Sequence, residues 1–207
     1  ASMEGAVGGS GYSVPESLAG DPRTVELVRD LLGRGNAEIS RESLKRAMVV
    51  AAVTGTSMAV DMLLSLGVEV GGGDVLSEEG DPIYNAVVGG HVEVLELLLG
   101  AGANASARLA SGVGNSLLHL AAENGDPFSI RALVRAGAEV DARNGDDATP
   151  LMQAVAARGR TAVTTLIELG ADVGGKDWLG RDALEVARRL DPADEWLVEV
   201  LEKAKVK

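Results

Sequence analysis

The chain has 207 residues, of which 46% are hydrophobic and 24% charged, so it is long enough to bury a sizeable core and is not disordered throughout. Aromatic residues make up only 2%, which favours closely packed helices of Leu, Val, Ile and Ala over a large β-sandwich. The net charge of -12 argues against a nucleic-acid partner, and the lack of cysteine excludes a disulfide framework, a thiolate nucleophile and a cysteine zinc site.

Residues 1–20 are rich in Gly and Ser and predict a flexible tail, in which Ala1-Ser2 before Met3 has the character of a cloning remnant. They lack the basic start and long apolar centre of a secretory signal. No apolar run approaches the roughly 20 residues that span a bilayer, so we expect no membrane insertion. An intracellular protein, cytoplasmic or nuclear, fits these features and the absence of cysteine.

The first predicted helix covers residues 22–35. Asp21 is a favourable N-cap residue, and Pro22 suits the first helical position. Charged residues such as Arg23 and Glu26 lie on the outer side of this helix. We therefore interpret it as the N-terminal cap of a stack of repeats, because the end of such a stack needs a polar outer face.

An internal repeat runs through the rest of the chain. Each copy has an apolar residue, an apolar pair three and four positions later, and a glycine three positions after the pair, which is typical of one helix face closed by a left-handed residue. The successive glycines are 32, 35, 35 and 33 residues apart. The copies are Val28, Leu31-Leu32, Gly35; Val60, Leu63-Leu64, Gly67; Leu95, Leu98-Leu99, Gly102; Ile130, Leu133-Val134, Gly137; and Val163, Leu166-Ile167, Gly170.

Another helix precedes this one in each copy, and a small residue in that preceding helix recurs in the same register. Ala86, Ala121, Ala154 and Ala187 are 35, 33 and 33 residues apart. An alanine at a fixed place in a short helix allows the neighbouring helix to approach closely. The unit is thus predicted to be helix, tight turn, helix, loop.

These residues resemble the ankyrin repeat, whose signature is a TPLH-x-A block, a Gly turn, an apolar second helix and a closing Gly-Ala pair. Thr149-Pro150-Leu151, Leu118-His119-Leu120-Ala121-Ala122 and the Gly-Ala pairs at 102–103, 137–138 and 170–171 carry the resemblance. It implies an all-α solenoid of stacked helix-turn-helix units with connecting loops over residues 21–207. The implied units are repeats at about 40–72, 79–112, 114–145 and 147–177, and a C-terminal capping repeat at 180–207.

Three departures from the pattern mark places where the geometry differs. The loops after Gly67 and Gly102 are each two residues longer than the 33-residue period allows, and we expect them to be irregular. Arg158 replaces the glycine of one turn. In the last repeat the apolar trio slips by one residue, to Leu197, Val200 and Leu201, in a helix that Asp191-Pro192 begins and that reads as the natural end of the stack.

No pattern of catalytic residues is present. The resemblance gives His119 a hydrogen bond to neighbouring backbone, and we expect a structural role for His91 as well, so that neither binds a metal. The clusters GVEVGGGD and GADVGGKD lack the Lys-Ser/Thr of a phosphate-binding loop, and no serine lies in a G-x-S-x-G elbow. We therefore expect no enzyme activity, no cofactor and no metal.

The resemblance also implies where a partner binds, namely on loop tips and on the outward face of the first helix of each unit. Trp178 is the anchor we favour, against the alternative that it folds back onto the adjacent repeat; Trp196 is expected to pack inside the last repeat. The candidate partner-binding residues are Trp178, Leu179, Arg181, Asp146, Asn115, Glu123, Asn124 and Glu78. Other positions on the same surface are Gly80, Val113, Ala148, Val88, Gly89, Ala156 and Ala157.

The function expected from these features is a non-catalytic module that binds another protein or peptide. The acidic loop residues are either a solvated surface or a rim that attracts a basic partner. The alternative is a regulatory or targeting domain of a larger enzyme or chromatin-associated protein, including one that binds basic, histone-like tails. Self-association is a third option, although we expect a monomer.

Overall fold

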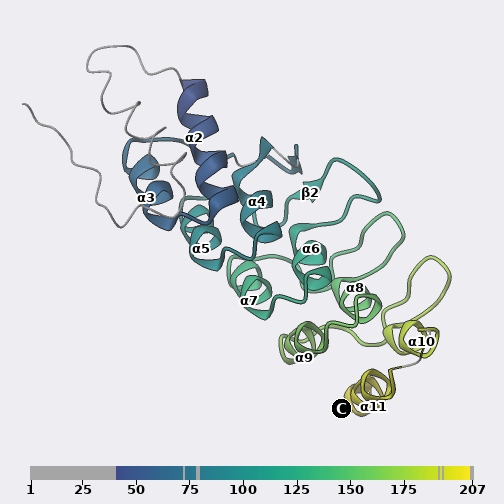
Figure 1. Ribbon diagram of the computed structural model, residues 1–207. Helices are drawn as coiled ribbons and strands as arrows, with labels where there is room; N and C mark the ends of the chain where they lie inside the picture. Colours follow the sequence, from purple (N-terminus) through teal and green to yellow (C-terminus); the bar gives the residue numbers. More distant parts are fainter. Residues whose placement is uncertain (1–40, 72, 78–79, 191, 193, 206–207) are drawn as a thin grey trace, which may run out of the picture.

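The computed structural model describes residues 41–71, 73–77, 80–190, 192 and 194–205 (Figure 1). The predicted tail, the predicted cap helix 22–35 and its closing Gly35 lie outside the described residues. In the described part of the chain, no helix is long and apolar enough to cross a membrane.

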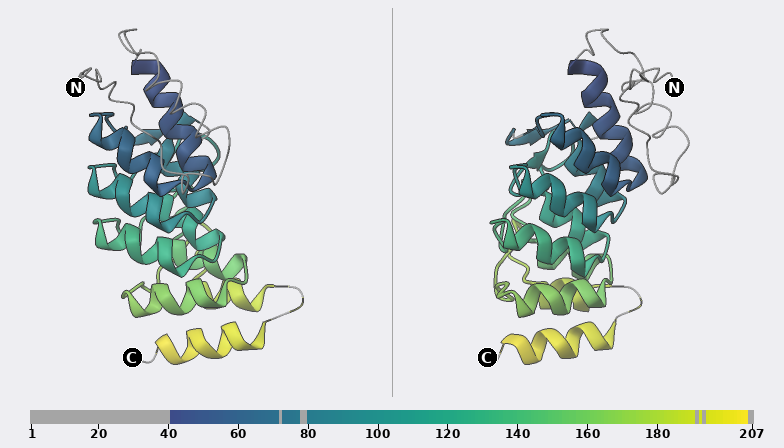
Figure 2. Two further views of the ribbon diagram at one scale, coloured as in Figure 1. Left: turned by 60° about the vertical axis from the view of Figure 1, so that its left-hand side comes forward. Right: turned by 90° about the vertical axis from the view of Figure 1, so that its left-hand side faces the viewer.

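Helices in the described residues come in consecutive pairs, and the pairs stack into an elongated solenoid (Figure 2). The first helices of the pairs form one layer and the second helices form another, because each packs against the corresponding helix of the neighbouring pairs. The expected all-α solenoid of helix-turn-helix units is confirmed. The pairs are α2 (Arg41–Thr54) with α3 (Ser57–Ser65), α4 (Pro82–Val88) with α5 (Val92–Gly100), α6 (Leu117–Glu123) with α7 (Pro127–Arg135), α8 (Pro150–Ala156) with α9 (Arg160–Glu168), and α10 (Ala183–Arg188) with α11 (Glu195–Lys205).

The recurring glycines end the second helices as predicted. Gly67, Gly102, Gly137 and Gly170 have φ values of 79°, 93°, 97° and 91°, in the left-handed region that a side chain disfavours. At each of them the following residue donates its N–H to a carbonyl in the last helical turn, as Ala103 does to Leu98 at 3.0 Å. The alanines of the first helices, Ala86, Ala121, Ala154 and Ala187, are fully buried where the layers meet.

The prediction that the two long loops are irregular was wrong in part. β1 (Val75–Leu76) and β2 (Arg108–Leu109) are short parallel strands that pair Val75 with Arg108 and Leu76 with Leu109. The strands can align because the two extra residues of the first loop precede β1, whereas those of the second loop follow β2. The lengthened loops thus keep hydrogen-bonding register with each other.

The apolar positions at the C-terminal end of the stack follow the sequence pattern, but the predicted start of the last helix at Asp191-Pro192 was wrong. α11 begins at Glu195, because Asp194 Oδ1 accepts from the backbone N–H groups of Trp196, at 3.1 Å, and Leu197, at 3.3 Å, and so caps the helix. Leu197 and Leu201 are fully buried, and Val200 packs partly buried against the same core. Trp196 also packs there, with the Arg160 guanidinium 5.2 Å from the centroid of its ring, so the packing role expected for it is confirmed.

Candidate functional site

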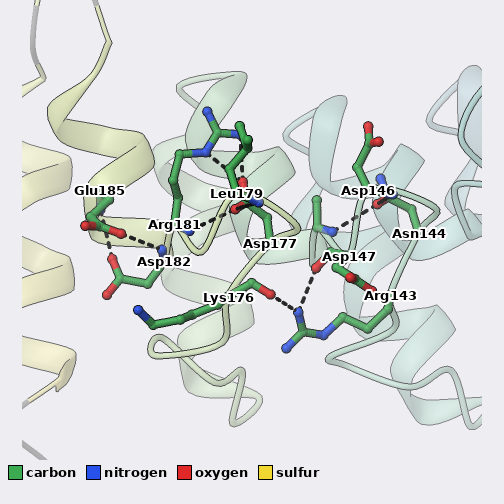
Figure 3. A network of polar contacts seen from close by, with 11 residues as sticks. Arg143, Asn144, Asp146, Asp147, Lys176, Asp177, Leu179, Arg181, Asp182 and Glu185 are labelled. Carbon is green, nitrogen blue, oxygen red and sulfur yellow. Dashed lines mark hydrogen bonds and ion pairs between the residues drawn. The ribbon is translucent and has the colours of Figure 1, made fainter.

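The loops that join one helix pair to the next project from the same edge of the stack (Figure 1). Arginines at one register position connect them. Arg108 Nη1 donates to the carbonyl of Arg143 at 2.6 Å, and Arg143 Nη1 donates to the carbonyls of Asp147, at 2.7 Å, and Lys176. Each guanidinium therefore binds the backbone of the next loop, which fixes neighbouring loops relative to each other. Figure 3 shows the contacts of Arg143.

The tip of the last loop is organised around a buried carboxylate. Asp177 Oδ1 accepts hydrogen bonds from the backbone N–H groups of Leu179, at 3.0 Å, and Arg181, at 2.8 Å, while Oδ2 accepts from Arg181 Nε at 2.8 Å (Figure 3). Burial alone raises the pKa of Asp177, but these hydrogen bonds and the positive charge of Arg181 outweigh it, and the net pKa is lowered. Asp177 is thus a carboxylate at neutral pH, and it holds Trp178 and Leu179 in a tight turn.

The preceding loop uses an amide in the same way. Asn144 Oδ1 accepts from the backbone N–H groups of Asp146 and Ala148, both at 3.0 Å, and its Nδ2 donates to Asn115 Oδ1 at 2.7 Å. Backbone bonds continue the connection from tip to tip: Gly145 donates to the Val113 carbonyl at 2.6 Å, and Trp178 donates to the Asp146 carbonyl at 3.1 Å. The last three loop tips therefore form one hydrogen-bonded ribbon.

Apolar side chains stand out from this ribbon. Trp178 is 63% exposed, Leu179 50% and Val113 41%. The exposure of Trp178 argues against the alternative in which it folds back onto the adjacent repeat. A tryptophan held on an ordered turn yet open to solvent is an arrangement that favours contact with a partner.

The other predicted residues differ in how free they are to bind. Glu123, Asn124 and Asp146 are exposed, the first two at the end of α6, but Asn124 Nδ2 already donates to the Val87 carbonyl at 3.2 Å. Arg181 is committed to its ion pair with Asp177, with Nη2 2.6 Å from Oδ2, and the Asn115 side-chain oxygen already accepts from Asn144. Glu78 lies outside the described residues. Of the other surface positions, Gly80, Val88, Gly89, Ala156 and Ala157 are exposed and Ala148 is half-buried.

Sequence reasoning missed the residues that position the tips, Arg108, Arg143, Asn144 and Asp177. A signal for them exists in the repeat register, because Arg143 follows Arg108 by 35 residues and Asp177 follows Asn144 by 33. These are the same intervals that separate the closing glycines. Polar residues in loops that recur at the repeat period are thus candidates for contacts between loops.

The histidines have the structural roles predicted for them. His119 Nε2 lies 2.9 Å from the Ala148 carbonyl, and His91 Nε2 lies 3.1 Å from the Val53 carbonyl, so each ring connects its own unit to a neighbouring one. Among the described residues, no three His, Cys, Asp or Glu side chains are grouped closely enough to hold a metal ion.

Comparisons with known proteins agree with this architecture. A family profile described as "Ankyrin repeats (3 copies)" matches residues 83–177. The chain is 32% identical over 147 residues to B-cell lymphoma 3 protein homolog of Mus musculus, an alignment that covers 70% of this chain and 32% of that protein. It is 36% identical over 110 residues to nuclear factor NF-kappa-B p105 subunit of Gallus gallus, covering 51% of this chain and 11% of that protein.

A plant protein gives a similar match. The chain is 30% identical over 144 residues to E3 ubiquitin-protein ligase KEG of Arabidopsis thaliana, covering 69% of this chain and 8% of that protein. The aligned part of the chain therefore corresponds to about a third or less of the length of each of these relatives.

Proposed function

The chain belongs to the ankyrin repeat family, and from that premise we propose that it binds another protein or peptide through its loop tips and the outward face of its first helices. Ankyrin repeats are protein–protein interaction modules, and the module proposed here performs no catalysis itself. The observation that carries the proposal is the exposed pair Trp178 and Leu179 on the turn organised by Asp177.

The rigidity of that turn matters for affinity. A flexible loop loses conformational entropy when a partner orders it, whereas a turn already held by hydrogen bonds loses less. Tryptophan is among the residues most often found as the energetic centre of an interface. Trp178 therefore combines a large apolar contact area with a low cost of ordering.

The charge of the surface supports a basic partner. Asp146 is an exposed carboxylate at a loop tip, Glu123 is an exposed carboxylate at the end of α6, and the whole chain carries a net charge of -12. Such charges accelerate the approach of a basic segment and exclude acidic competitors. A basic, histone-like tail is one partner of this kind.

A second candidate function is a regulatory or targeting role within a larger protein. The length of the relatives favours it, since a nuclear factor subunit and a ubiquitin ligase both carry the matching region as a small part of a longer chain. Binding through the same surface would then bring a partner to activities located elsewhere.

The loop-tip proposal is tested by comparing two aromatic truncations. The full chain, Trp178→Ala and Phe128→Ala serve as baits for quantitative mass spectrometry in cells that produce the protein, and the recovered partner is then titrated against each by calorimetry. Phe128 is the matched control because it is 69% exposed at the start of α7, on the turn side of the stack. We expect Trp178→Ala to weaken binding by about 30-fold and Phe128→Ala to leave it unchanged.

Unchanged thermal melting of both variants is the check that folding is intact. Equal affinity of Trp178→Ala and the unmodified chain for the recovered partner would remove Trp178 as an anchor. A stronger loss with Phe128→Ala would move the binding surface to the turn side.

A further inference from the structure

Asp81 occupies a position at which its counterparts cap a helix. Asp81, Ser116, Thr149 and Asp182 precede the first helices of four successive units, at intervals of 35, 33 and 33 residues. Ser116, Thr149 and Asp182 each accept a hydrogen bond from the backbone N–H three residues later, at 3.4, 3.3 and 2.9 Å. In the described part of the chain, the Asp81 side chain accepts no such bond from α4.

The Asp81 carboxylate faces a cavity instead. The cavity, of about 290 Å³, lies between α2, the segment after α3 and the start of α4, and Lys45, Met48, Glu69, Val70 and Gly71 line it with Asp81. A Cβ atom at Gly71 would be 3.8 and 3.9 Å from the two carboxylate oxygens. Within the described residues, Oδ1 of Asp81 is buried and has no hydrogen-bond partner.

An unpartnered carboxylate in this position is unfavourable unless a ligand compensates. Burial raises the pKa of Asp81 above its usual range, which reflects the cost of removing the charge from water. Among the described residues, the charged side chains that line the cavity are Glu69, Asp81 and the exposed Lys45, so this part of the lining carries one net negative charge. A cation entering the cavity would offset this charge and would supply the missing hydrogen bond.

The last repeat shows which cation this register position accommodates. Asp182, the counterpart of Asp81, accepts from the ammonium group of Lys205, with Nζ 2.7 Å from Oδ2. Burial alone raises the pKa of Asp182, but the hydrogen bond from Lys205 and a backbone N–H outweigh it and lower the net pKa. Asp81 has the same side chain at the same place in the repeat, but it faces a cavity formed with the preceding helix pair, whereas the lysine at Asp182 comes from the second helix of its own pair.

We propose that the cavity beside Asp81 binds the ammonium group of a lysine side chain from a partner protein, with Asp81 as the counter-ion. The site lies about three helix pairs away from the Trp178 turn along the stack, so it is a second point of attachment. This lysine site rests on the proposed function in one respect, that a partner protein supplies the lysine. The binding of a free amine does not depend on the loop tips.

The probe for this site is n-butylammonium, which reproduces the end of a lysine side chain, with neutral n-butanol as its matched control. Each is titrated into the full chain while the backbone amide signals of Gly71 and Asp81 are followed by NMR. We expect saturable shifts at both amides with butylammonium and none with butanol. The pKa of Asp81, followed by its carboxyl carbon signal, should fall when butylammonium binds.

Three variants separate binding from folding. Asp81→Asn keeps the shape of the side chain but removes its charge. It should weaken the binding of butylammonium by about tenfold or more. Asp81→Ser should also lose binding, yet raise the melting temperature, because serine can cap α4 as Ser116 caps α6. Asp61→Asn removes an exposed carboxylate of α3 outside the cavity and should bind butylammonium as the unmodified chain does.

The proposal is overturned if butylammonium gives no saturable shift, if butanol gives the same shift, or if Asp81→Asn binds equally well. Equal affinity for ethylguanidinium would overturn the assignment to lysine. Saturable amine binding together with an unaffected Trp178→Ala interaction would retain this site and reject the loop tip, so the two proposals fail separately.

Discussion

Two residues other than glycine, Asp147 and Arg158, have positive φ in the described part of the chain, at 53° and 59°. Each stands at a register position that is glycine in a neighbouring unit. Asp147 matches Gly114 and Gly180 in the loops, and Arg158 matches Gly125 in the turn between helices. Arg158 gains a compensating hydrogen bond from Nη2 to the Pro192 carbonyl at 2.7 Å, whereas Asp147 is an exposed loop residue.

The strain at this loop position predicts opposite effects of two substitutions. Gly180→Ala should lower the free energy of unfolding by about 1 kcal/mol, because alanine disfavours a φ of 74° although nothing lies within 4 Å of the new Cβ. Asp147→Gly should raise it by about 0.5 kcal/mol, since relief of strain exceeds the entropy lost by a more flexible unfolded chain. Urea unfolding measures both; a stabilising Gly180→Ala would contradict the strain argument.

At the scale of an element, His119 fixes α6 to the loop that leads into α8. The Ser116 backbone N–H donates to Nδ1 at 3.2 Å, so Nε2 carries the proton that is donated to the Ala148 carbonyl at 2.9 Å. Burial lowers the pKa of His119 and the charge of Arg108 lowers it further, while the hydrogen bond to Ala148 acts in the opposite direction. The neutral ring is therefore part of the folded structure.

This arrangement makes stability depend on pH in a defined direction. The unfolded chain takes up a proton at the usual histidine pKa of 6.5, whereas folded His119 takes it up only at lower pH, so acidification favours unfolding. Between pH 7.5 and 5.5 this residue should remove up to about 1.4 kcal/mol from the free energy of unfolding. His119→Gln cannot gain a proton and should lose correspondingly less over that range in urea unfolding. Identical pH profiles for the two proteins would contradict this role.

The whole molecule is a stack in which each helix packs mainly against its own pair and the neighbouring pairs. Its core consequently extends from α2 to α11 as a row of contacts instead of a single centre. In such a stack, stability is close to a sum of unit and interface contributions, and terminal units open more easily than central ones. The position of a buried residue along the stack then determines how many units a substitution destabilises.

Leu133 and Leu201 test this directly, because both are fully buried leucines on second helices, one central and one terminal. Leu133→Ala should lower the global free energy of unfolding by about 3 kcal/mol and accelerate amide exchange over several units. Leu201→Ala should accelerate exchange chiefly in α10 and α11. Uniformly faster exchange from α4 to α11 in Leu201→Ala would show instead that the stack unfolds as one unit.

The sequence by itself determined the solenoid, the glycines that close the second helices and the recurring buried alanines, because these depend on local spacing repeated at a period of 33 to 35 residues. It also placed Trp178 at a loop tip, since the register of the repeat counts loop positions as well as helical ones. Arg143 and Asp177 also recur at the repeat period. Their recurrence indicates contacts between loops only once the structure shows that neighbouring loops touch.

The tertiary structure alone decided which polar groups satisfy one another. Asp81 and Asp182 are the same residue type at the same register position, yet one faces a cavity and the other a lysine 23 residues further along the chain. Arg181 looks free in the sequence but is held by Asp177. Such outcomes depend on the positions of groups from neighbouring units in three dimensions, which a pattern of local spacing does not contain.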